Sequence, residues 1–210
     1  SIKLGAPVQF QNLTLIPLLV DRDCAPGYLL LDDALERKLA RITEVSEAGS
    51  VPELMFVNDA PEKVLLIDGE ELVGARQNRI LNVTVLVGAN RKIKIPVSCV
   101  EQGRWHYKSR HFASAERTLF SAARARKMRA VSGSLREHGS RHSDQGAIWN
   151  NISAKAKFLH CESPTGSMSD IYEQQQARIE DYVQAFIAQS ETPSPLAGEA
   201  PSSTPSPLGG

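Results

Sequence analysis

The fold is decided by VLLIDGEELV, residues 64–73, in which two apolar runs flank an Asp-Gly pair. Short runs of valine, leucine and isoleucine are typical of strands, and Asp68-Gly69 between them predicts a two-residue hairpin turn. Further along the chain, residues 80–87 and 93–100 predict a second hairpin that turns at residues 88–90. The centre of the chain is therefore expected to form an antiparallel sheet.

The strand pattern continues on both sides of this centre. Lys92 and Lys94 alternate with Ile93 and Ile95, which predicts a strand with one solvated face. Pro96 places that strand at a sheet edge or at a bulge. The shorter predicted elements are strands at 8–10, 13–16, 42–45 and 54–57, and a short helix within 29–35 that is capped by Asp32 or Asp33.

The spacing of apolar residues changes from two to about 3.6 after residue 103. A helix is predicted from about 116 to 138, with an apolar face that carries Met128. Ser143 and Ser169 are the predicted caps of two further helices. Strands followed by helices, without strict alternation, are typical of an α+β fold.

The predicted architecture is a mostly antiparallel sheet in the N-terminal two-thirds, packed with C-terminal helices. We expect a single domain over residues 1–189, strand-rich over 1–103 and helical over 104–189. Residues 190–210 are rich in proline and serine and nearly repeat themselves. Such a segment buries too little apolar surface to offset its ordering entropy, which predicts a disordered tail.

Composition limits the class of protein. The 210 residues include 24 basic and 24 acidic side chains, and this balance argues against a globally basic nucleic-acid binder. No apolar run of about 18 residues predicts a membrane span, and no secretory signal is visible at Ser1. Cys24, Cys99 and Cys161 are widely spaced and odd in number, which is typical of reduced thiols. We therefore expect a soluble cytoplasmic protein.

Residues 68–82 carry more polar groups than a strand or a turn requires. Gln77 and Asn78 each bring a donor and an acceptor, and Arg79 brings a planar fork suited to carboxylate or phosphate. Glu71 lies on the same segment and is a candidate proton acceptor. Two interpretations stay open: a ligand site, or a polar loop whose arginines pair with neighbouring glutamates.

A second polar segment follows the strand that ends near residue 100. If that strand stays regular, Cys99 and Glu101 point inward at its end, with Arg104 and Trp105 just beyond. A carboxylate beside an arginine at a pocket mouth suits general-base work or contacts with sugar hydroxyls. The alternative for Glu101 is a structural ion pair with Arg104. Cys99 is a candidate nucleophile, although such a cysteine is more often inert, and Trp105 is more often a packing residue than a stacking platform.

Residues 104–142 hold ten lysines and arginines but only two acidic residues. This run predicts either a grip on a phosphate-bearing ligand or RNA, or a solvated helix face, and the second is favoured. Nucleic acid is therefore not the expected partner. The histidines show no metal-ligand spacing, because Gly139 interrupts the helix between His138 and His142. The sequence predicts no metal site and no cofactor.

The segments 69–82 and 95–105 together resemble a bacterial family, the ARG and Rhodanese-Phosphatase-superfamily-associated Protein domain. The similarity extends over about residues 1–189. It implies genomic association with ADP-ribosylglycohydrolases and rhodanese or phosphatase enzymes, and hence metabolism of NAD-derived or sugar-nucleotide compounds. The residues that match and are carried over as the expected site are Glu71, Gln77, Asn78, Arg79, Cys99, Glu101, Arg104 and Trp105.

Two functions from different classes follow. The first is a small-molecule site for an ADP-ribose-like or nucleotide-sugar ligand, and whether the ligand is also processed stays open. Arg79 and Arg104 would hold phosphate or carboxylate, and Gln77 and Asn78 would bind ribose hydroxyls. Either Glu101 or Glu71 would accept a proton. The second is a non-catalytic interaction domain that pairs with itself or with another protein. A homo-oligomer fits either function, and a membrane is not an expected partner.

Overall fold

The computed structural model describes residues 2–20, 26–46 and 52–190, and the chain divides into two units. Unit 1 contains residues 2–20 and 175–190, and unit 2 contains the residues between them. The predicted tail lies outside the described residues except for Ser190, which ends a helix. None of the described helices is both long and apolar enough to cross a bilayer.

Unit 2 contains a closed barrel and a smaller sheet. Its strands are β5 (Tyr28–Leu30), β6 (Ala40–Glu44), β7 (Glu53–Asn58), β8 (Lys63–Leu66), β9 (Glu70–Gly74), β10 (Arg79–Leu81), β11 (Val85–Val87), β12 (Arg91–Cys99) and β13 (Phe112–Thr118). Its helices are α1 (Leu31–Glu36), α2 (Ser121–His138), α3 (Gln145–Phe158) and α4 (Met168–Gln174). The barrel order is β10-β12-β7-β6-β13-β9, and β11, β8 and β5 form the separate sheet. The α+β class, with strands ahead of most helices, is confirmed.

Apolar side chains fill the barrel. Along β7 the period-two alternation places Leu54 and Phe56 fully inside the barrel, while their neighbours along the strand are only half-buried. The same core cluster includes Val64 and Leu66 of β8 and Leu31 of α1. Because these side chains fill its interior, the barrel is a packed core and not a channel. Each fully buried side chain of this size contributes roughly 1.5–3 kcal/mol to the free energy of unfolding.

One end of the barrel is closed by the smaller sheet and α1. This is the end where β6 begins and where β7 and β10 finish. Three connections lie there: the one through β5 and α1, the one through β8 and the one through β11. The opposite end carries the other three loops of the barrel. Any ligand site built on loops is therefore expected at that opposite end.

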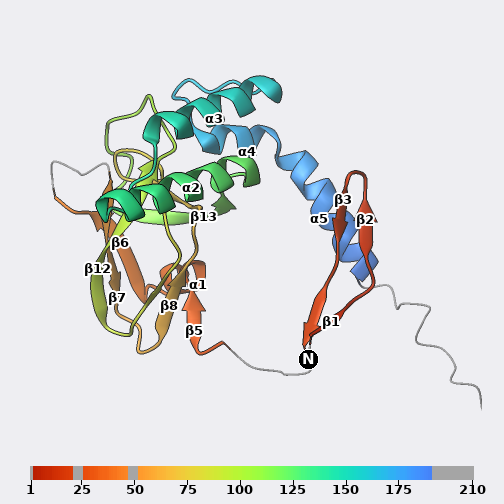
Figure 1. Cartoon of the computed structure of the whole chain (residues 1–210), viewed down its shortest axis with the longest axis horizontal. Coiled ribbons are helices and arrows are strands. Elements are labelled where there is room, and N and C mark those ends of the chain that lie inside the picture. Colours follow the sequence, from red (N-terminus) through yellow and green to blue (C-terminus); the bar gives the residue numbers. More distant parts are fainter. Residues whose placement is uncertain (1, 21–25, 47–51, 191–210) are drawn as a thin grey trace, which may run out of the picture. The chain divides into compact units, whose positions relative to one another are not determined.

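Three helices cover one side of the barrel. Figure 1 shows α2, α3 and α4 together over the strands, and a second apolar cluster joins them to the barrel. Ile80 and Val100 supply the strand side of this cluster, and Ile148, Ile152 and Ile171 supply the helix side. Along β10, Ile80 thus faces this cluster while the next residue, Leu81, belongs to the core of the barrel.

The buried face of α2 differs from the prediction. The buried residues are Ala123, Lys127 and Val131, spaced four apart, whereas Met128 is 50% exposed. Lys127 is accepted inside because its ammonium group donates to Asp68 and to the backbone oxygen of Leu81, 2.6 Å away. A lysine that counted as polar in the sequence pattern therefore belongs to the packed face.

The first predicted hairpin is wrong in its pairing. Residues 63–66 and 70–74 are both strands, but β8 pairs with β11 and β5, and β9 pairs with β10 and β13. The turn between them has the Glu70 N–H donating to the Ile67 oxygen at 3.2 Å, with a positive φ at Gly69 and not at Asp68. That pattern matches a type II turn, which splays its flanking strands apart instead of pairing them.

The second predicted hairpin is correct only at the residues farthest from its predicted turn, where 79–81 pair with 97–99. Arg79 pairs with Cys99 in an antiparallel ladder, but β11 leaves the barrel and pairs with β8. Pro96 is not at a sheet edge, since β12 has a neighbour on each side; it forms the last residue pair with β7. The exposed and buried alternation predicted for Lys92 to Ile95 is confirmed.

The helix starts also differ from prediction. Residues 112–118 form β13, so α2 begins at Ser121 and not near residue 116. Asp144, not Ser143, caps α3, and its side chain accepts from the Ala147 N–H at 2.9 Å. Ser169 lies inside α4 and does not cap it, and α1 has no side-chain cap.

Unit 1 contains a long hairpin and one helix. Its strands are β1 (Ile2–Leu4), β2 (Val8–Phe10), β3 (Leu13–Leu15) and β4 (Leu18–Val20), and its helix is α5 (Gln176–Ser190). The predicted pairing of 8–10 with 13–16 is confirmed over β2 and β3. The Phe10 ring packs edge-on against Tyr182 of α5, with ring centres 5.1 Å apart. Gly5 allows the two halves of the hairpin to approach, because a Cβ there would lie 2.9 Å from the Pro17 ring.

Candidate functional site

Three loops meet at the open end of the barrel. They join β6 to β7, β9 to β10 (residues 75–78) and β12 to β13 (residues 100–111). Residues 47–51 of the first loop lie outside the described part. The barrel topology places seven of the eight predicted site residues at this one end, in these loops or at the strand positions beside them. They are Gln77, Asn78, Arg79, Cys99, Glu101, Arg104 and Trp105.

A buried ion pair forms the centre of this region. The Arg104 Nη2 lies 2.7 Å from the Glu101 Oε2, and the two side chains are 6% and 9% exposed. Arg104 also donates to the backbone oxygens of Ala75 at 2.8 Å and His106 at 3.0 Å. Burial raises the pKa of Glu101, but hydrogen bonds from Arg104 and from the Asn78 N–H outweigh burial and lower it. Glu101 is therefore ionised at neutral pH, and its charge is neutralised by Arg104.

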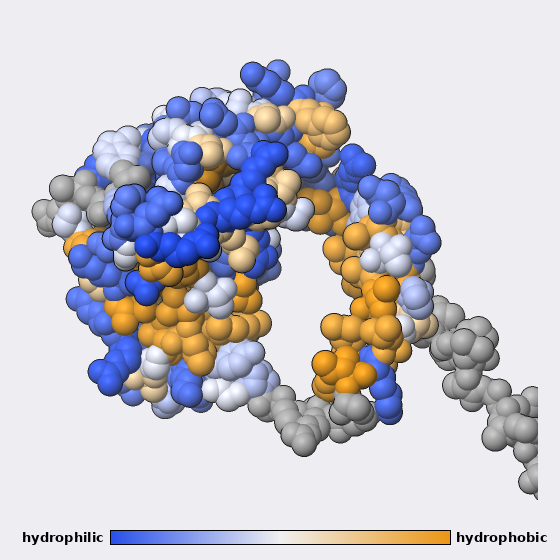
Figure 2. Space-filling model, viewed as in Figure 1, coloured by the Kyte–Doolittle hydropathy of each residue, from blue (hydrophilic) through white to orange (hydrophobic). Residues whose placement is uncertain are grey.

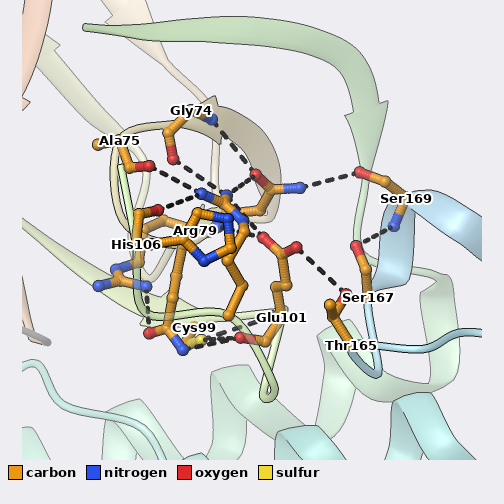
Figure 3. A network of polar contacts seen from close by, with 12 residues as sticks. Gly74, Ala75, Arg79, Cys99, Glu101, His106, Thr165, Ser167 and Ser169 are labelled. Carbon is orange, nitrogen blue, oxygen red and sulfur yellow. Dashed lines mark hydrogen bonds and ion pairs between the residues drawn. The ribbon is translucent and has the colours of Figure 1, made fainter. Parts of the chain in front are cut away.

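The two amides tie the loops to this ion pair (Figure 3). The Asn78 N–H donates to the Glu101 carboxylate at 3.1 Å, and the Asn78 oxygen accepts from Arg104 at 3.0 Å. The Gln77 amide donates to the Glu101 backbone oxygen at 2.9 Å and accepts from Arg79 at 2.9 Å. The loop after β9 and the loop after β12 are thus held together by side chains that have already found partners.

Gly74 allows the close approach of these loops. Its φ of +131° lies in a region that other residues rarely adopt, and a Cβ there would lie 2.7 Å from the His111 oxygen. The next residue, Ala75, also has a positive φ. The chain therefore turns sharply after β9, which brings Gln77 and Asn78 over the barrel end.

Glu71 joins the network from outside the barrel. It pairs in register with Ile80, which faces the helices, so its side chain lies under α4. The Asn78 amide donates to the Ser169 hydroxyl at 3.1 Å, and that hydroxyl donates to Glu71 at 2.9 Å. Burial raises the pKa of Glu71 to about 7, although Ser169 and Arg117 lower it. Glu71 is thus partly protonated near neutral pH.

Cys99 is a neutral thiol. It is fully buried, and burial raises its pKa in spite of the nearby Arg79 and the Glu101 backbone. Its Sγ donates to the Glu101 oxygen at 3.1 Å. Because the thiolate is the nucleophilic form, this environment favours a packing role over catalysis.

Arg79 has hydrogen-bonding capacity that is not used up, as does one carboxylate oxygen of Glu71 among the described residues. The Arg79 side chain is fully buried and, like Leu81, is on the inward face of β10. Nη1 donates to Gln77, but among the described residues Nε and Nη2 have no hydrogen-bond partner. Burial lowers the pKa of Arg79, while Cys99 and Glu44 raise it. A guanidinium stays charged at any physiological pH, so two of its donors lie inside the protein unpaired.

A hollow of about 900 Å³ lies at this end of the barrel. It is lined by Thr43, Glu44, Ser46, Arg76, Tyr107, Lys108, Ser109 and Arg110. The Arg76 guanidinium lies 4.5 Å from the Tyr107 ring centre and 5.7 Å from that of Trp105. Arg79 lies 6.0 Å from the same Trp105 ring, so this half-exposed tryptophan is close to both the buried arginine and an arginine of the hollow.

Sequence reasoning missed several residues of this end. Glu44 lines the hollow, and among the described residues neither of its carboxylate oxygens has a hydrogen-bond partner although both are shielded from solvent. Thr165 and Ser169 bind the network from the segment before α4 and from its first turn. No spacing in the sequence signals these residues. Only the closure of the barrel brings the end of β6 to the same place as the start of β10.

Part of the basic run is used within the fold. Among the described residues, four of its ten lysines and arginines pair with acidic side chains: Arg104, Arg117, Arg124 and Lys127. Lys108 and Arg110 instead line the hollow. The basic residues of the loop and those of α2 therefore have different surroundings.

Comparison with known proteins gives a match to a protein family. No curated protein and no solved structure matches the chain. A family model matches residues 1–198, which is nearly the whole chain and includes the barrel and all three loops of its open end. The chain therefore belongs to the family called ARG and Rhodanese-Phosphatase-superfamily-associated Protein domain.

Proposed function

We propose that the open end of the barrel binds a small metabolite that carries an oxyanion, such as a phosphate, together with hydroxyl groups. The observation that carries this proposal is the pair of Arg79 and Glu44. Both lie at one end of the barrel, Arg79 has two unpaired donors, and Glu44 has two unpaired acceptor oxygens within the described chain. Buried polar groups are almost always satisfied, so each of them calls for a partner.

The ligand chemistry follows from the two unpaired groups. Nε and Nη2 of a guanidinium form a fork that matches two oxygens of a phosphate or carboxylate. A glutamate carboxylate accepts hydrogen bonds, and hydroxyl groups donate them. The negative charge of Glu44 opposes the lowering of the Arg79 pKa, but among the described residues no ion pair joins the two side chains. A sugar phosphate supplies both an oxyanion and hydroxyls between two such groups.

The walls of the hollow suit the same ligand. Lys108 and Arg110 are exposed on its rim, where they attract an anion, and Tyr107 offers an aromatic ring. Trp105 lies near both Arg76, which lines the hollow, and the buried Arg79, so we expect the ligand to reach Arg79 through movement of the Trp105 and Arg76 side chains. Glu101 and Arg104 then act as the support that fixes the loops, and not as groups that touch the ligand.

A thermal-shift titration tests this proposal. Ribose 5-phosphate, ADP-ribose, inorganic phosphate and ribose are compared, and tryptophan fluorescence reports movement of Trp105. A ligand at about 100 times its Kd adds roughly 2.7 kcal/mol, which raises Tm by roughly 5–10 °C. We expect the phosphorylated sugars to shift Tm and fluorescence, and ribose alone to do neither.

Matched variants locate the site. The rim variant Lys108→Ala with Arg110→Ala is expected to weaken binding roughly tenfold with little change in stability. Lys92→Ala with Lys94→Ala, also exposed but on β12, is the control and is expected to bind as the native protein does. The proposal is wrong if no phosphorylated compound shifts the native protein, or if both pairs of substitutions weaken binding equally.

A further inference from the structure

The Cys99 end of β12 has a different neighbour on each side. On one side, Arg79 of β10 is the partner of Cys99 in the antiparallel ladder. On the other side, the ladder with β7 ends at Pro96, and Gln145 of α3 takes the place of a strand. The Gln145 amide accepts from the Cys99 N–H and donates to the Cys99 oxygen, each at 2.8 Å. The start of α3 is therefore fastened to the barrel wall beside Cys99.

Trp149 lies one turn after Gln145 and thus on the same side of α3. The helices that cover the barrel are polar outside, as Figure 2 shows for the visible surface of α2, and apolar inside, where Ile148 is buried. Trp149 is partly buried, and its indole nitrogen is shielded from solvent. Among the described residues this nitrogen has no hydrogen-bond partner. An indole N–H can only donate, so it calls for an acceptor.

The Trp149 indole and the Arg79 guanidinium lie near the same sulfur atom. Burial raises the pKa of the Cys99 thiol, and Arg79 and the Trp149 indole are among the groups that lower it. A neutral thiol is only a weak acceptor, and its own proton is donated to the Glu101 oxygen at 3.1 Å. Within the described chain, Nε and Nη2 of Arg79 and Nε1 of Trp149 are therefore three buried donors in one region that lack an acceptor.

We propose that these three donors form a phosphoryl-binding subsite, in which Trp149 is a specificity-determining residue. The inference rests on the proposed function, because it concerns the oxyanion of the same ligand. The Arg79 fork matches two oxygens of a carboxylate or of a phosphoryl group. The Trp149 N–H approaches from the other flank of β12, and a phosphoryl group offers it a third oxygen, whereas a carboxylate must share one of its two. The subsite therefore favours a phosphoryl group over a carboxylate.

A matched pair of ligands tests the subsite by calorimetry. Ribose 5-phosphate carries a phosphoryl group, and ribonate carries a carboxylate on the same five-carbon sugar skeleton. We expect the native protein to bind ribose 5-phosphate at least roughly tenfold more tightly than ribonate. Trp149→Phe keeps an aromatic ring but removes the N–H. It is expected to weaken the binding of ribose 5-phosphate roughly tenfold and to leave that of ribonate nearly unchanged.

Tyr172→Phe is the control variant. It also removes one donor from an aromatic side chain of the helical layer, but this hydroxyl already donates to the Thr118 oxygen at 2.5 Å. The variant is expected to bind both ligands as the native protein does. If it weakened the binding of ribose 5-phosphate as much as Trp149→Phe, the effect would belong to the packing of the helices and the inference would be overturned.

Nuclear magnetic resonance of the native protein tests the same contact without relying on the folding of Trp149→Phe. The chain has two tryptophans and hence two indole N–H signals, and Trp105→Phe identifies the one that belongs to Trp149. A hydrogen bond to a phosphoryl oxygen is expected to move that signal downfield. Ribose 5-phosphate should therefore shift the Trp149 signal, and ribonate should shift it much less.

The outcomes separate this inference from the proposed function. The inference alone is overturned if ribose 5-phosphate binds the native protein but leaves the Trp149 signal in place, or binds no more tightly than ribonate. It is likewise overturned if Trp149→Phe binds ribose 5-phosphate as the native protein does, or loses affinity for both ligands equally. If neither ligand binds the native protein, the proposed function is wrong and the inference falls with it.

Discussion

Glu70 and Glu71 are neighbours in β9, and burial raises the pKa of each to about 7. An exposed glutamate loses its proton near 4.5, so the folded chain holds two protons that the unfolded chain has already released. Their contribution to stability is fully present below pH 4.5 and is lost as pH rises through 7. Hydrogen bonds, to the Ile67 N–H for Glu70 and to the Ser169 hydroxyl for Glu71, reduce this loss but do not remove it.

Substitution of Glu71 by glutamine is therefore expected to flatten the pH dependence. Glutamine still accepts from Ser169 and needs no proton, so Glu71→Gln should be on the order of 2 kcal/mol more stable than the native protein at pH 8 and similar to it at pH 5. Urea unfolding at the two pH values measures this. Glu70→Gln is a parallel test and is expected to remove a similar part of the loss of stability between pH 5 and pH 8. An unchanged pH profile for Glu71→Gln would contradict the raised pKa of Glu71.

At the same scale, the sequence predicted most of the residues that lie together at the open end of the barrel, and their roles in binding or catalysis stay predictions. Glu101 and Arg104 were chosen as groups for ligand or proton work, with an ion pair as the alternative, and they do form an ion pair. Glu44 was not chosen, because an acidic residue at the end of a strand carries no local signal. Its place opposite Arg79 depends on barrel closure, which is a long-range property.

At the scale of elements, α2 is fastened to the turn between β8 and β9. Asp68 of that turn binds Arg124 at 2.8 Å and also binds Lys127, and both basic residues belong to α2. Burial lowers the pKa of Lys127 below its usual value, and the hydrogen bond and charge of Asp68 oppose this shift without reversing it. A charge inside the protein is tolerated only while its partners remain in place.

Lys127→Met is expected to destabilise the protein by about 3 kcal/mol, because Asp68 and the Leu81 oxygen lose a buried donor. Arg129→Met, on the exposed face of the same helix, is the control and should change stability by less than about 0.5 kcal/mol. Chemical unfolding measures both. Similar small losses for the two variants would show that the buried lysine does not hold α2 in place.

The strands themselves were predictable, but their partners were not. Alternation along residues 42–45 and 54–57 correctly indicated β6 and β7. The Asp-Gly pair suggested a hairpin, yet the φ values at Asp68 and Gly69 direct β9 into a different sheet from β8. β13 was missed because its sequence, FASAERT, is poor in β-branched residues and is held as a strand by pairing with β9.

At the scale of the whole molecule, the two apolar clusters lie entirely within unit 2. A fragment of residues 26–174 is therefore expected to fold without the hairpin and α5, as a monomer, with Tm within a few degrees of the main transition of the full chain. Circular dichroism melting and sedimentation of the fragment measure this. An unfolded or aggregated fragment would contradict the division of the chain into two units.

The closed barrel has a consequence for how this family can diversify. Every barrel strand has a neighbour on both sides, so strand pairing closes the barrel without help from the loops at the open end, although β13 and β6 share a single residue pair. Insertions or exchanges in those loops are therefore expected to leave the scaffold in shape. Under the proposed function, we expect relatives that share this architecture to differ in small-molecule preference through changes to roughly a few dozen nucleotides of coding sequence.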